Sequence, residues 1–254
     1  MWYRTSDLEH FYKTPLGIRT RRILVQILQM QGFYTFKKED KKGFFGYPWP
    51  FLRKEQKEDS LVLLSAARFS PFFSQEKRVN GEAKSIIVAS ETELPLQDHS
   101  LDYVFIIHWL EYAYDSQKAL REIWRVLKNE GRVILVIPNR RSLWAAKDST
   151  PFGQGISFSY SQILHLLRDS FFTPLNIQGA LYMPPTSWRF LTFFFFSLER
   201  FSKKRVGRFL GFFAGVWVVE ASKHTHAPLL DSALKTHFLS LKKNLSYERE
   251  ALKE

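Results

Sequence analysis

The stretch Glu93–Asn139, ELPLQDHSLDYVFIIHWLEYAYDSQKALREIWRVLKNEGRVILVIPN, decides the fold of this 254-residue chain. Its apolar runs at Tyr103–Ile107 and Val133–Ile137 are typical of parallel strands buried on both faces. Between them, Gln117–Leu127 places its apolar residues on one helical face. Gly131 follows where a glycine would end the helix and turn the chain into the next strand. The stretch therefore predicts a strand–helix–strand unit of an α/β sheet.

The same patterns recur on both sides of this stretch. Upstream, Leu61–Leu64 and Ile86–Val88 are short, continuous apolar runs of the kind found in buried strands. Downstream, Tyr160–Asp169 has a helical pattern, whereas Thr173–Met183 and Gly215–Ala221 have the character of strands. Strands that alternate with helices of this length predict a Rossmann-like, doubly wound α/β fold with a mostly parallel sheet.

The amino-terminal part of the chain is less regular. Asp7–Met30 predicts one or two helices, with a break at Pro15. Gly43–Leu52, GFFGYPWPFL, contains two Gly and two Pro and predicts a turn rather than a strand. We therefore expect three regions, which are an N-terminal helical extension over residues 1–42, an α/β domain over residues 43–222 and a polar, basic C-terminal tail over residues 223–254.

Composition excludes several classes of function. The chain has no Cys, which excludes disulfides, thiolate metal sites and cysteine nucleophiles. No spacing typical of metal ligands appears, so we expect no metal site. The longest apolar run lies within Phe190–Leu198 and is far shorter than the roughly 20 residues that cross a bilayer. Together with a start that lacks a signal-peptide pattern, this predicts a cytoplasmic protein.

The net charge of +12 is concentrated outside the expected α/β core. Residues 1–42 hold nine basic and four acidic groups and residues 189–208 hold six and one, whereas residues 43–188 hold sixteen and fifteen. Such flanks could make weak contact with an anionic membrane or, less readily, with nucleic acid, or they could be solvated faces. The predicted helix Trp188–Phe209, rich in Phe and basic groups, could lie on a membrane, gate a lipophilic acceptor or simply pack on the sheet.

Two runs within Glu93–Asn139 carry a family resemblance. The first is LPLQDHSLDYV at 94–104, followed by HWLEY at 108–112, and the second is ALREIWRVLKNEGRVILVIPN at 119–139. They resemble the class I S-adenosylmethionine-dependent methyltransferases, in particular the type 11 group. There, an LPF-x-D-x-S-F-D-x-V run enters the fourth strand, and a helix ending in R-V-L-K-x-G-G leads to the fifth. The resemblance implies a seven-stranded sheet with an antiparallel last strand, S-adenosyl-L-methionine as cofactor and methyl transfer as the reaction.

The resemblance also implies where the cofactor binds. The family's Gly-rich turn has its counterpart in Gly43–Leu52, where Gly46 and Tyr47 match a G-L-G-Y-x-x-P-Y-L version of the motif and Phe44 stands where the first glycine should be. Ser90 takes the place of an Asp near the adenine, with two acidic residues beside it. The candidate cofactor-binding residues are Gly43, Gly46, Tyr47, Ser90, Glu91, Glu93 and His108.

His108 is also the candidate catalytic residue, because it ends a strand at the edge of the sheet where ligands bind in this fold. Alternatively it is a strand-end histidine that bonds a neighbouring backbone group, and Glu111 anchors the turn that follows. The loop over Pro138–Ser159 should face the methyl acceptor, or else pack on the core. Its candidate substrate-binding residues, with the first residue of the next helix, are Arg140, Arg141, Trp144, Phe152 and Tyr160.

These observations favour methyl transfer from S-adenosylmethionine to an unidentified small-molecule or lipophilic acceptor. Two alternatives stay open. Phe44, Ser65 and Ser90 at expected cofactor positions would also suit a degenerate, non-catalytic member that serves as a binding or scaffold protein. The basic flanks would suit a peripheral membrane or nucleic-acid binder. The sequence does not indicate an oligomeric state.

Overall fold

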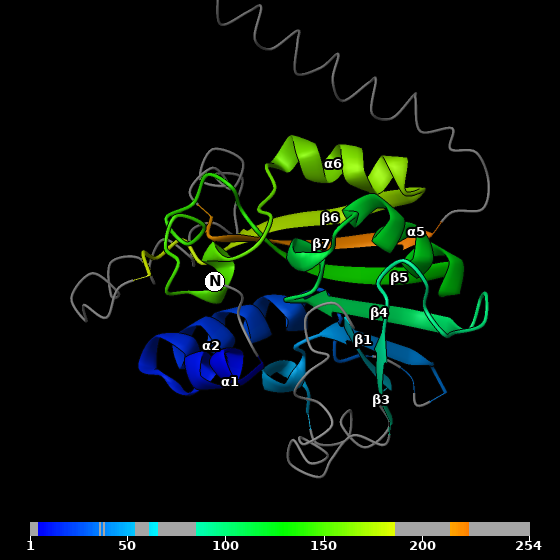
Figure 1. The fold of residues 1–254 in the computed structure, drawn as a ribbon, viewed down its shortest axis with the longest axis horizontal. Coiled ribbons are helices and arrows are strands. Elements are labelled where there is room, and N and C mark those ends of the chain that lie inside the picture. Colours follow the sequence, from blue (N-terminus) through cyan, green and yellow to red (C-terminus); the bar gives the residue numbers. More distant parts are fainter. Residues whose placement is uncertain are drawn as a thin grey trace, which may run out of the picture. The chain divides into compact units, whose positions relative to one another are not determined.

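The computed structural model describes residues 5–35, 37, 39–53, 61–65, 85–185 and 214–223. These residues contain a seven-stranded sheet of order β3-β2-β1-β4-β5-β7-β6 (Figure 1). Strands β1 to β5 run parallel, and β7 is antiparallel to both of its neighbours. The strands are β1 (Lys42–Gly46), β2 (Leu61–Ser65), β3 (Ser85–Ala89), β4 (Leu101–Ile107), β5 (Leu127–Pro138), β6 (Phe172–Ala180) and β7 (Val216–Lys223). The predicted Rossmann-like fold is confirmed.

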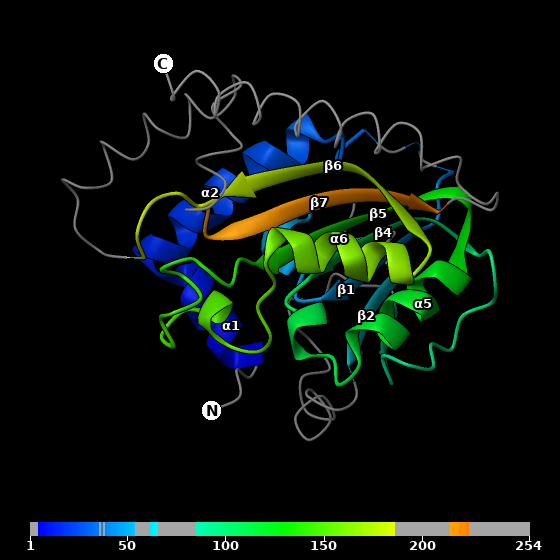
Figure 2. The same cartoon turned by 90° about the horizontal axis from the view of Figure 1, so that it is seen from above.

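Helices cover both faces of this sheet (Figure 2). They are α1 (Thr5–Lys13), α2 (Pro15–Met30), α5 (Ser116–Val126) and α6 (Tyr160–Asp169), and three single turns of 3-10 helix are η1 (Trp49–Phe51), η2 (Leu110–Tyr112) and η3 (Pro151–Gly153). Because side chains alternate along a strand, neighbours such as Phe44 and Phe45 enter different cores. Phe44 joins the core formed with α1 and α2, and Phe45 joins the core formed with α5 and α6.

The first strand is the main departure from the sequence-based expectation. Gly43–Gly46 was expected to be part of a turn, yet Lys42–Gly46 forms β1 and pairs with β2 on one side and β4 on the other. Its two Gly and two Phe carry little strand pattern of their own. The backbone hydrogen bonds of two neighbouring strands and the burial of both Phe rings override that weak local preference.

The expected boundary at residue 42 does not separate compact units. It falls inside β1, and the described residues up to Lys223 belong to one compact unit. Leu8 of α1 and Leu24 of α2 are fully buried in the same hydrophobic cluster as Phe44. The two amino-terminal helices are therefore part of the α/β domain. The predicted tail was residues 223–254, but its first residue, Lys223, is buried at the end of β7. Residues 224–254 lie outside the described residues.

Gly131 does not end the helix as expected. The helix α5 ends at Val126, and the chain continues directly into β5. Glu130, not Gly131, adopts the left-handed backbone conformation, with φ of 62°. Backbone carbonyls at the C-terminal end of α5 instead accept hydrogen bonds from a residue of β7. The buried Lys223 donates hydrogen bonds of 2.7 Å to the carbonyls of Trp124 and Leu127.

Candidate functional site

The carboxyl ends of β1 and β4 meet at the edge of the sheet where ligands bind in doubly wound folds. Gly46 ends β1 with a φ of +86°, a conformation that favours glycine. A Cβ at this position would overlap the carbonyl oxygen of Ile107. Immediately afterwards, the Tyr47 N–H donates a 2.9 Å hydrogen bond to that same oxygen. Gly46 is therefore required for the close approach of two backbones at this edge.

His108, directly after β4, is the centre of the candidate site. It is fully buried and has a left-handed backbone, with φ of 54°. Its Nδ1 lies 3.2 Å from Oε1 of Glu111, and Oε2 of Glu111 accepts a 3.2 Å hydrogen bond from the Trp109 N–H. Glu111 therefore anchors the turn, as the sequence indicated, and also orients the imidazole ring.

The second nitrogen of His108 bonds a residue that the sequence did not single out. The hydroxyl of Tyr12, on α1, lies 2.7 Å from Nε2 of His108. Burial, and then the nearby Glu111, Tyr47 and Tyr112, raise the pKa of Tyr12 well above its ordinary value. Tyr12 therefore stays protonated, and its hydroxyl can donate a hydrogen bond to Nε2 when the imidazole hydrogen lies on Nδ1, facing the carboxylate of Glu111.

Aromatic rings enclose the Tyr12 side chain. Tyr47 stacks against it at 6.2 Å between ring centroids, and Phe51 meets it edge-on at 5.5 Å. On the far side of His108, the ring of Phe152 lies 4.9 Å from the imidazole. All of these side chains are buried. The structure thus brings the candidate residues Tyr47, His108 and Phe152 together, and adds Tyr12 and Phe51.

The residues predicted after β3 lie elsewhere along the same edge. Ser90 and Glu93 are exposed and form an isolated antiparallel bridge with each other. Glu91 is buried, and its Oε1 accepts a 3.2 Å hydrogen bond from the Tyr114 N–H. Glu91 thus supports the turn after β4, whereas Ser90 and Glu93 face solvent.

An ion-paired arginine holds this segment against α5. Arg125 donates to the carbonyls of Leu94 and Leu96 and to the carboxylates of Asp98 and Glu122, at 2.6 to 3.0 Å. Burial alone would raise the pKa of Glu122, but hydrogen bonds from Arg125 and from the Leu94 N–H lower it overall. Arg125 and Glu122 therefore position the Leu94–Asp98 segment at the edge of the site.

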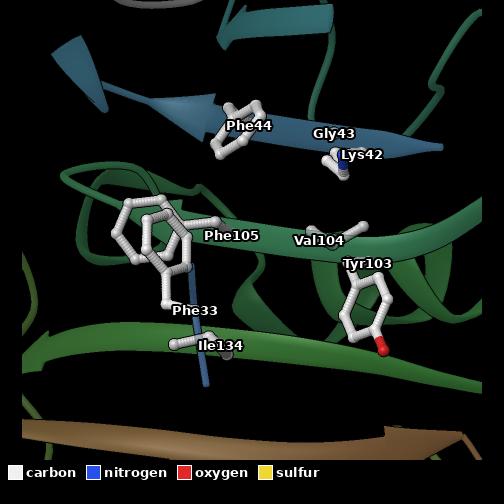
Figure 3. Close-up of a pocket in the computed structure, with 8 residues that line it drawn as sticks. All are labelled: Phe33, Lys42, Gly43, Phe44, Tyr103, Val104, Phe105 and Ile134. Atoms are coloured by element: carbon white, nitrogen blue, oxygen red, sulfur yellow. The ribbon is translucent and has the colours of Figure 1, made fainter. Parts of the chain in front are cut away.

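Gly43 and Phe44 do not belong to a cofactor turn. Gly43 lies within β1, paired with Leu61 and Val104. Phe44 points toward Phe33 and Phe105, at 6.2 and 6.3 Å between ring centroids (Figure 3). The assignment of Phe44 to the first glycine position of the motif was wrong, because the structure forms a strand where the alignment placed a turn.

The cavity in Figure 3 lies away from the candidate site. It has a volume of only about 10 Å³ and is lined by Phe33, Lys42, Gly43, Phe44, Tyr103, Val104, Phe105 and Ile134. Lys42 and Tyr103 stand near the amino ends of β1 and β4, opposite to the edge that carries Gly46 and His108. A volume of about 10 Å³ holds at most a single water molecule, so this cavity is far too small for a nucleoside cofactor.

The loop after β5 is mostly a packed structure. Trp144 and Phe152 are each 1 % exposed, and the Trp144 indole donates a 2.7 Å hydrogen bond to the Met183 carbonyl. Arg140 and Arg141 are exposed, and Tyr160 is half exposed against Trp217. Of the five candidate substrate-binding residues, Phe152 is the one that contacts His108.

Two further expectations concern metals and membranes. The part of the chain that the structure describes contains no cluster of acidic and His residues able to hold a metal ion. Among the described helices, none combines the length and apolarity that crossing a bilayer requires. The basic segment 189–208 lies outside the described residues.

Tyr12 carries no motif that sequence reasoning could have used. It is one of several aromatic residues before the Thr14–Pro15 break, in a segment that was assigned to an extension. Its role follows from the docking of α1 beside β1 and β4, which brings residues 96 positions apart into contact.

Comparison with known proteins relates the chain to methyltransferases. Residues 66–135 match the type 11 family described as "Methyltransferase domain". An uncharacterised protein of Methanocaldococcus jannaschii is 35 % identical over 103 residues, which cover 35 % of this chain and 45 % of that protein. A probable S-adenosylmethionine-dependent methyltransferase of Mycobacterium tuberculosis is 29 % identical over 101 residues, covering 39 % of this chain and 36 % of that protein. The chain thus matches less than half the length of these relatives.

A solved structure supports the fold over a longer span. A methyltransferase of Thermotoga maritima, described as a possible histamine N-methyltransferase, superimposes with a TM-score of 0.53. The match covers 84 % of this chain and 99 % of that one at 16 % identity. At such low identity the similarity establishes the architecture and not the reaction.

Proposed function

We propose that this chain, whose residues 66–135 match a methyltransferase family, is a class I S-adenosylmethionine-dependent methyltransferase that binds S-adenosylmethionine and transfers the methyl group to a small-molecule or lipophilic acceptor. One observation carries the proposal. Gly46 ends β1 and His108 directly follows the adjacent parallel strand β4, at the carboxyl edge where doubly wound folds bind their ligands.

The described residues fit a nucleoside cofactor along part of this edge. Gly46 keeps the turn after β1 free of a Cβ, and Tyr47 offers a ring beside it. The exposed hydroxyl of Ser90 and carboxylate of Glu93 can accept hydrogen bonds from the amine of an adenine or from ribose hydroxyls. These four residues would hold the cofactor, which supplies an electrophilic methyl group on a sulfonium.

The position of Phe44 gives no reason to expect a degenerate cofactor site. Phe44 is a core residue, so it does not obstruct the turn that ends at Gly46. The space next to His108 is filled by Tyr12, which leaves the described edge near Ser90 as the exposed part of the site.

Calorimetry with S-adenosylhomocysteine tests the proposal without requiring the acceptor. We expect saturable binding and a rise in the melting temperature of the chain, since a ligand that binds the folded state alone adds about 2.7 kcal/mol at a concentration of one hundred times Kd. Absence of both heat and thermal shift at millimolar ligand would refute methyl transfer from this cofactor.

A pair of surface variants locates the site. Ser90→Arg puts a long charged side chain at the expected adenine position and should weaken S-adenosylhomocysteine binding by about tenfold or more. Gln97→Arg, an equally exposed position in the same β3–β4 connection, is the control and should leave binding unchanged. Equal affinities of the two variants would place the cofactor elsewhere.

A further inference from the structure

Tyr12, His108 and Glu111 form a line of hydrogen bonds across the buried site. A carboxylate faces Nδ1 of the imidazole, and a hydroxyl faces Nε2. This is the arrangement of a general base with its orienting acid, in which the group on Nε2 is the one whose proton is removed. In the present structure that position is held by a phenol of the chain itself.

We propose that the acceptor of this protein is a phenol, that its hydroxyl takes the place of the Tyr12 hydroxyl on Nε2 of His108, and that His108 is the base that removes its proton. The inference rests on the proposed methyl transfer. It names the acceptor class, a catalytic residue in His108 and a positioning residue in Glu111.

The aromatic rings around Tyr12 favour a phenol over an aliphatic alcohol as the methyl acceptor. Once Tyr12 is displaced, Tyr47 and Phe51 offer one face-on and one edge-on contact to a six-membered aromatic ring. Both contacts have the centroid separations that aromatic pairs prefer. The space beside Tyr47 and Phe51 fits a single ring whose hydroxyl reaches His108, because the Tyr12 ring already occupies it and its hydroxyl bonds His108.

The methyl transfer to the phenol oxygen balances in atoms, protons and electrons. The acceptor O–H bond breaks, its proton moves to Nε2 of His108, and the resulting imidazolium is stabilised by Glu111 at 3.2 Å. A lone pair of the oxygen forms the bond to the methyl carbon, and the carbon–sulfur bond breaks with its electron pair going to sulfur. Sulfonium thereby becomes a neutral thioether, and His108 returns the proton to solvent.

Chemical rescue tests the recognition of the hydroxyl without any cofactor. Tyr12→Ala removes the resident phenol, and p-cresol is the same side chain as a free molecule. We expect p-cresol to raise the melting temperature of Tyr12→Ala and to bind about tenfold tighter than toluene, which has the shape without the hydroxyl. Cyclohexanol, a hydroxyl without an aromatic ring, should bind more weakly than p-cresol.

The double variant Tyr12→Ala/His108→Asn separates the base from the cavity. Asn tolerates the left-handed backbone at position 108, so the turn is kept while the imidazole is lost. The preference for p-cresol over toluene should then disappear. Equal binding of p-cresol and toluene to Tyr12→Ala itself would overturn the inference, since it would show an apolar cavity without recognition of the hydroxyl.

A milder pair of variants keeps the test valid if Tyr12→Ala does not fold. Tyr12→Phe retains the ring and removes only the bond that holds it on His108, so p-cresol should bind several-fold tighter than to the wild type. Tyr34→Phe is the control, because the Tyr34 hydroxyl bonds the Phe51 carbonyl at 2.7 Å rather than His108. No measurable p-cresol binding to the wild type, or the same affinity in both variants, would contradict the proposal.

Turnover distinguishes the base from a merely structural residue. With S-adenosylmethionine present, we expect methylation of p-cresol by the wild type, and in His108→Asn a fall in kcat of about 10² or more in addition to a rise in KM from the lost hydrogen bond to the hydroxyl. Glu111→Gln should lower kcat and change its pH profile while p-cresol still binds. If S-adenosylhomocysteine does not bind, the proposed function fails. If it binds but p-cresol does not, only this inference fails.

Discussion

The two sides of the candidate site are built in contrasting ways. The β4–α5–β5 side lies within one continuous stretch, residues 93–139, and its parts are held by contacts between near neighbours in sequence, such as Glu122 with Arg125. The β1 side is assembled from α1, α2, β1 and the turn after it, and its contacts join distant residues, such as Tyr12 and His108. The motifs of the first side can be recognised in the sequence, whereas the residues of the second side come together only when the chain folds.

This contrast explains why one side resembles a family and the other departs from it. The continuous side needs specific residues at fixed spacings to close its own loops, so its pattern is recognisable. The assembled side needs only that aromatic rings and one glycine arrive at the right place, which many sequences can satisfy. Four substitutions test this difference, in order of decreasing effect.

Phe44→Ala should have the largest effect, a loss of about 3–5 kcal/mol in the free energy of unfolding, because it empties a buried ring site beside Phe33 and Phe105. Denaturant unfolding measures the loss, and Phe44→Leu is the control, with about 1 kcal/mol. Affinity for S-adenosylhomocysteine should stay close to the wild-type value in the folded Phe44→Leu protein. A large drop in that affinity with stability intact would return Phe44 to the cofactor turn.

Gly46→Ala should cost about 2–3 kcal/mol, since its Cβ would overlap the Ile107 carbonyl and its backbone is left-handed. Gly32→Ala is the matched control, because Gly32 also has a positive φ but an added Cβ would meet only the Thr35 side chain at 3.1 Å. That control should cost about 1 kcal/mol. Thermal unfolding that gives equal losses would argue against a special backbone contact at Gly46.

Arg125→Ala should destabilise the continuous side by about 2–3 kcal/mol, because it leaves two loop carbonyls and two carboxylates without their donor. Hydrogen exchange should show faster opening of the segment 94–98 than of β5. The control is Arg132→Ala, whose pair with Glu220 is half exposed and should contribute less than about 1 kcal/mol. Similar losses in the two variants would mean that the loop is held by other contacts.

Asp102→Asn should have the smallest effect and depend on pH. Burial alone would raise the pKa of Asp102, but hydrogen bonds from Lys128 and from the Lys41 N–H lower it overall. A carboxyl with a lowered folded-state pKa stabilises the fold above its ordinary value of 3.8 and loses that contribution as the pH falls through the folded value. The difference in unfolding free energy between wild type and variant should therefore shrink between about pH 7 and about pH 2. A difference that stays constant over this range would contradict the contribution of the hydrogen bonds from Lys128 and Lys41.

The sequence was most informative where structure is local. The spans of β2, β3, β4, α5, α6 and β7 were predicted to within a few residues from apolar runs and helical periodicity. It failed at β1, where two glycines in five residues conceal a central strand, and at Gly131, where Lys223 completes the helix end instead. Within the site, His108 and Glu111 were visible as a motif, but Tyr12 and Phe51 were not.

By itself the sequence determined the fold class, the resemblance to methyltransferases and the turn that carries His108 and Glu111. These three features depend on periodicity and on short spacings, which can be recognised in the sequence directly. Tertiary structure alone decided which hydroxyl lies on His108, which rings enclose it and that Phe44 belongs to the core. Those outcomes depend on how α1 docks beside two strands, and that docking follows from burial summed over many residues rather than from any one motif.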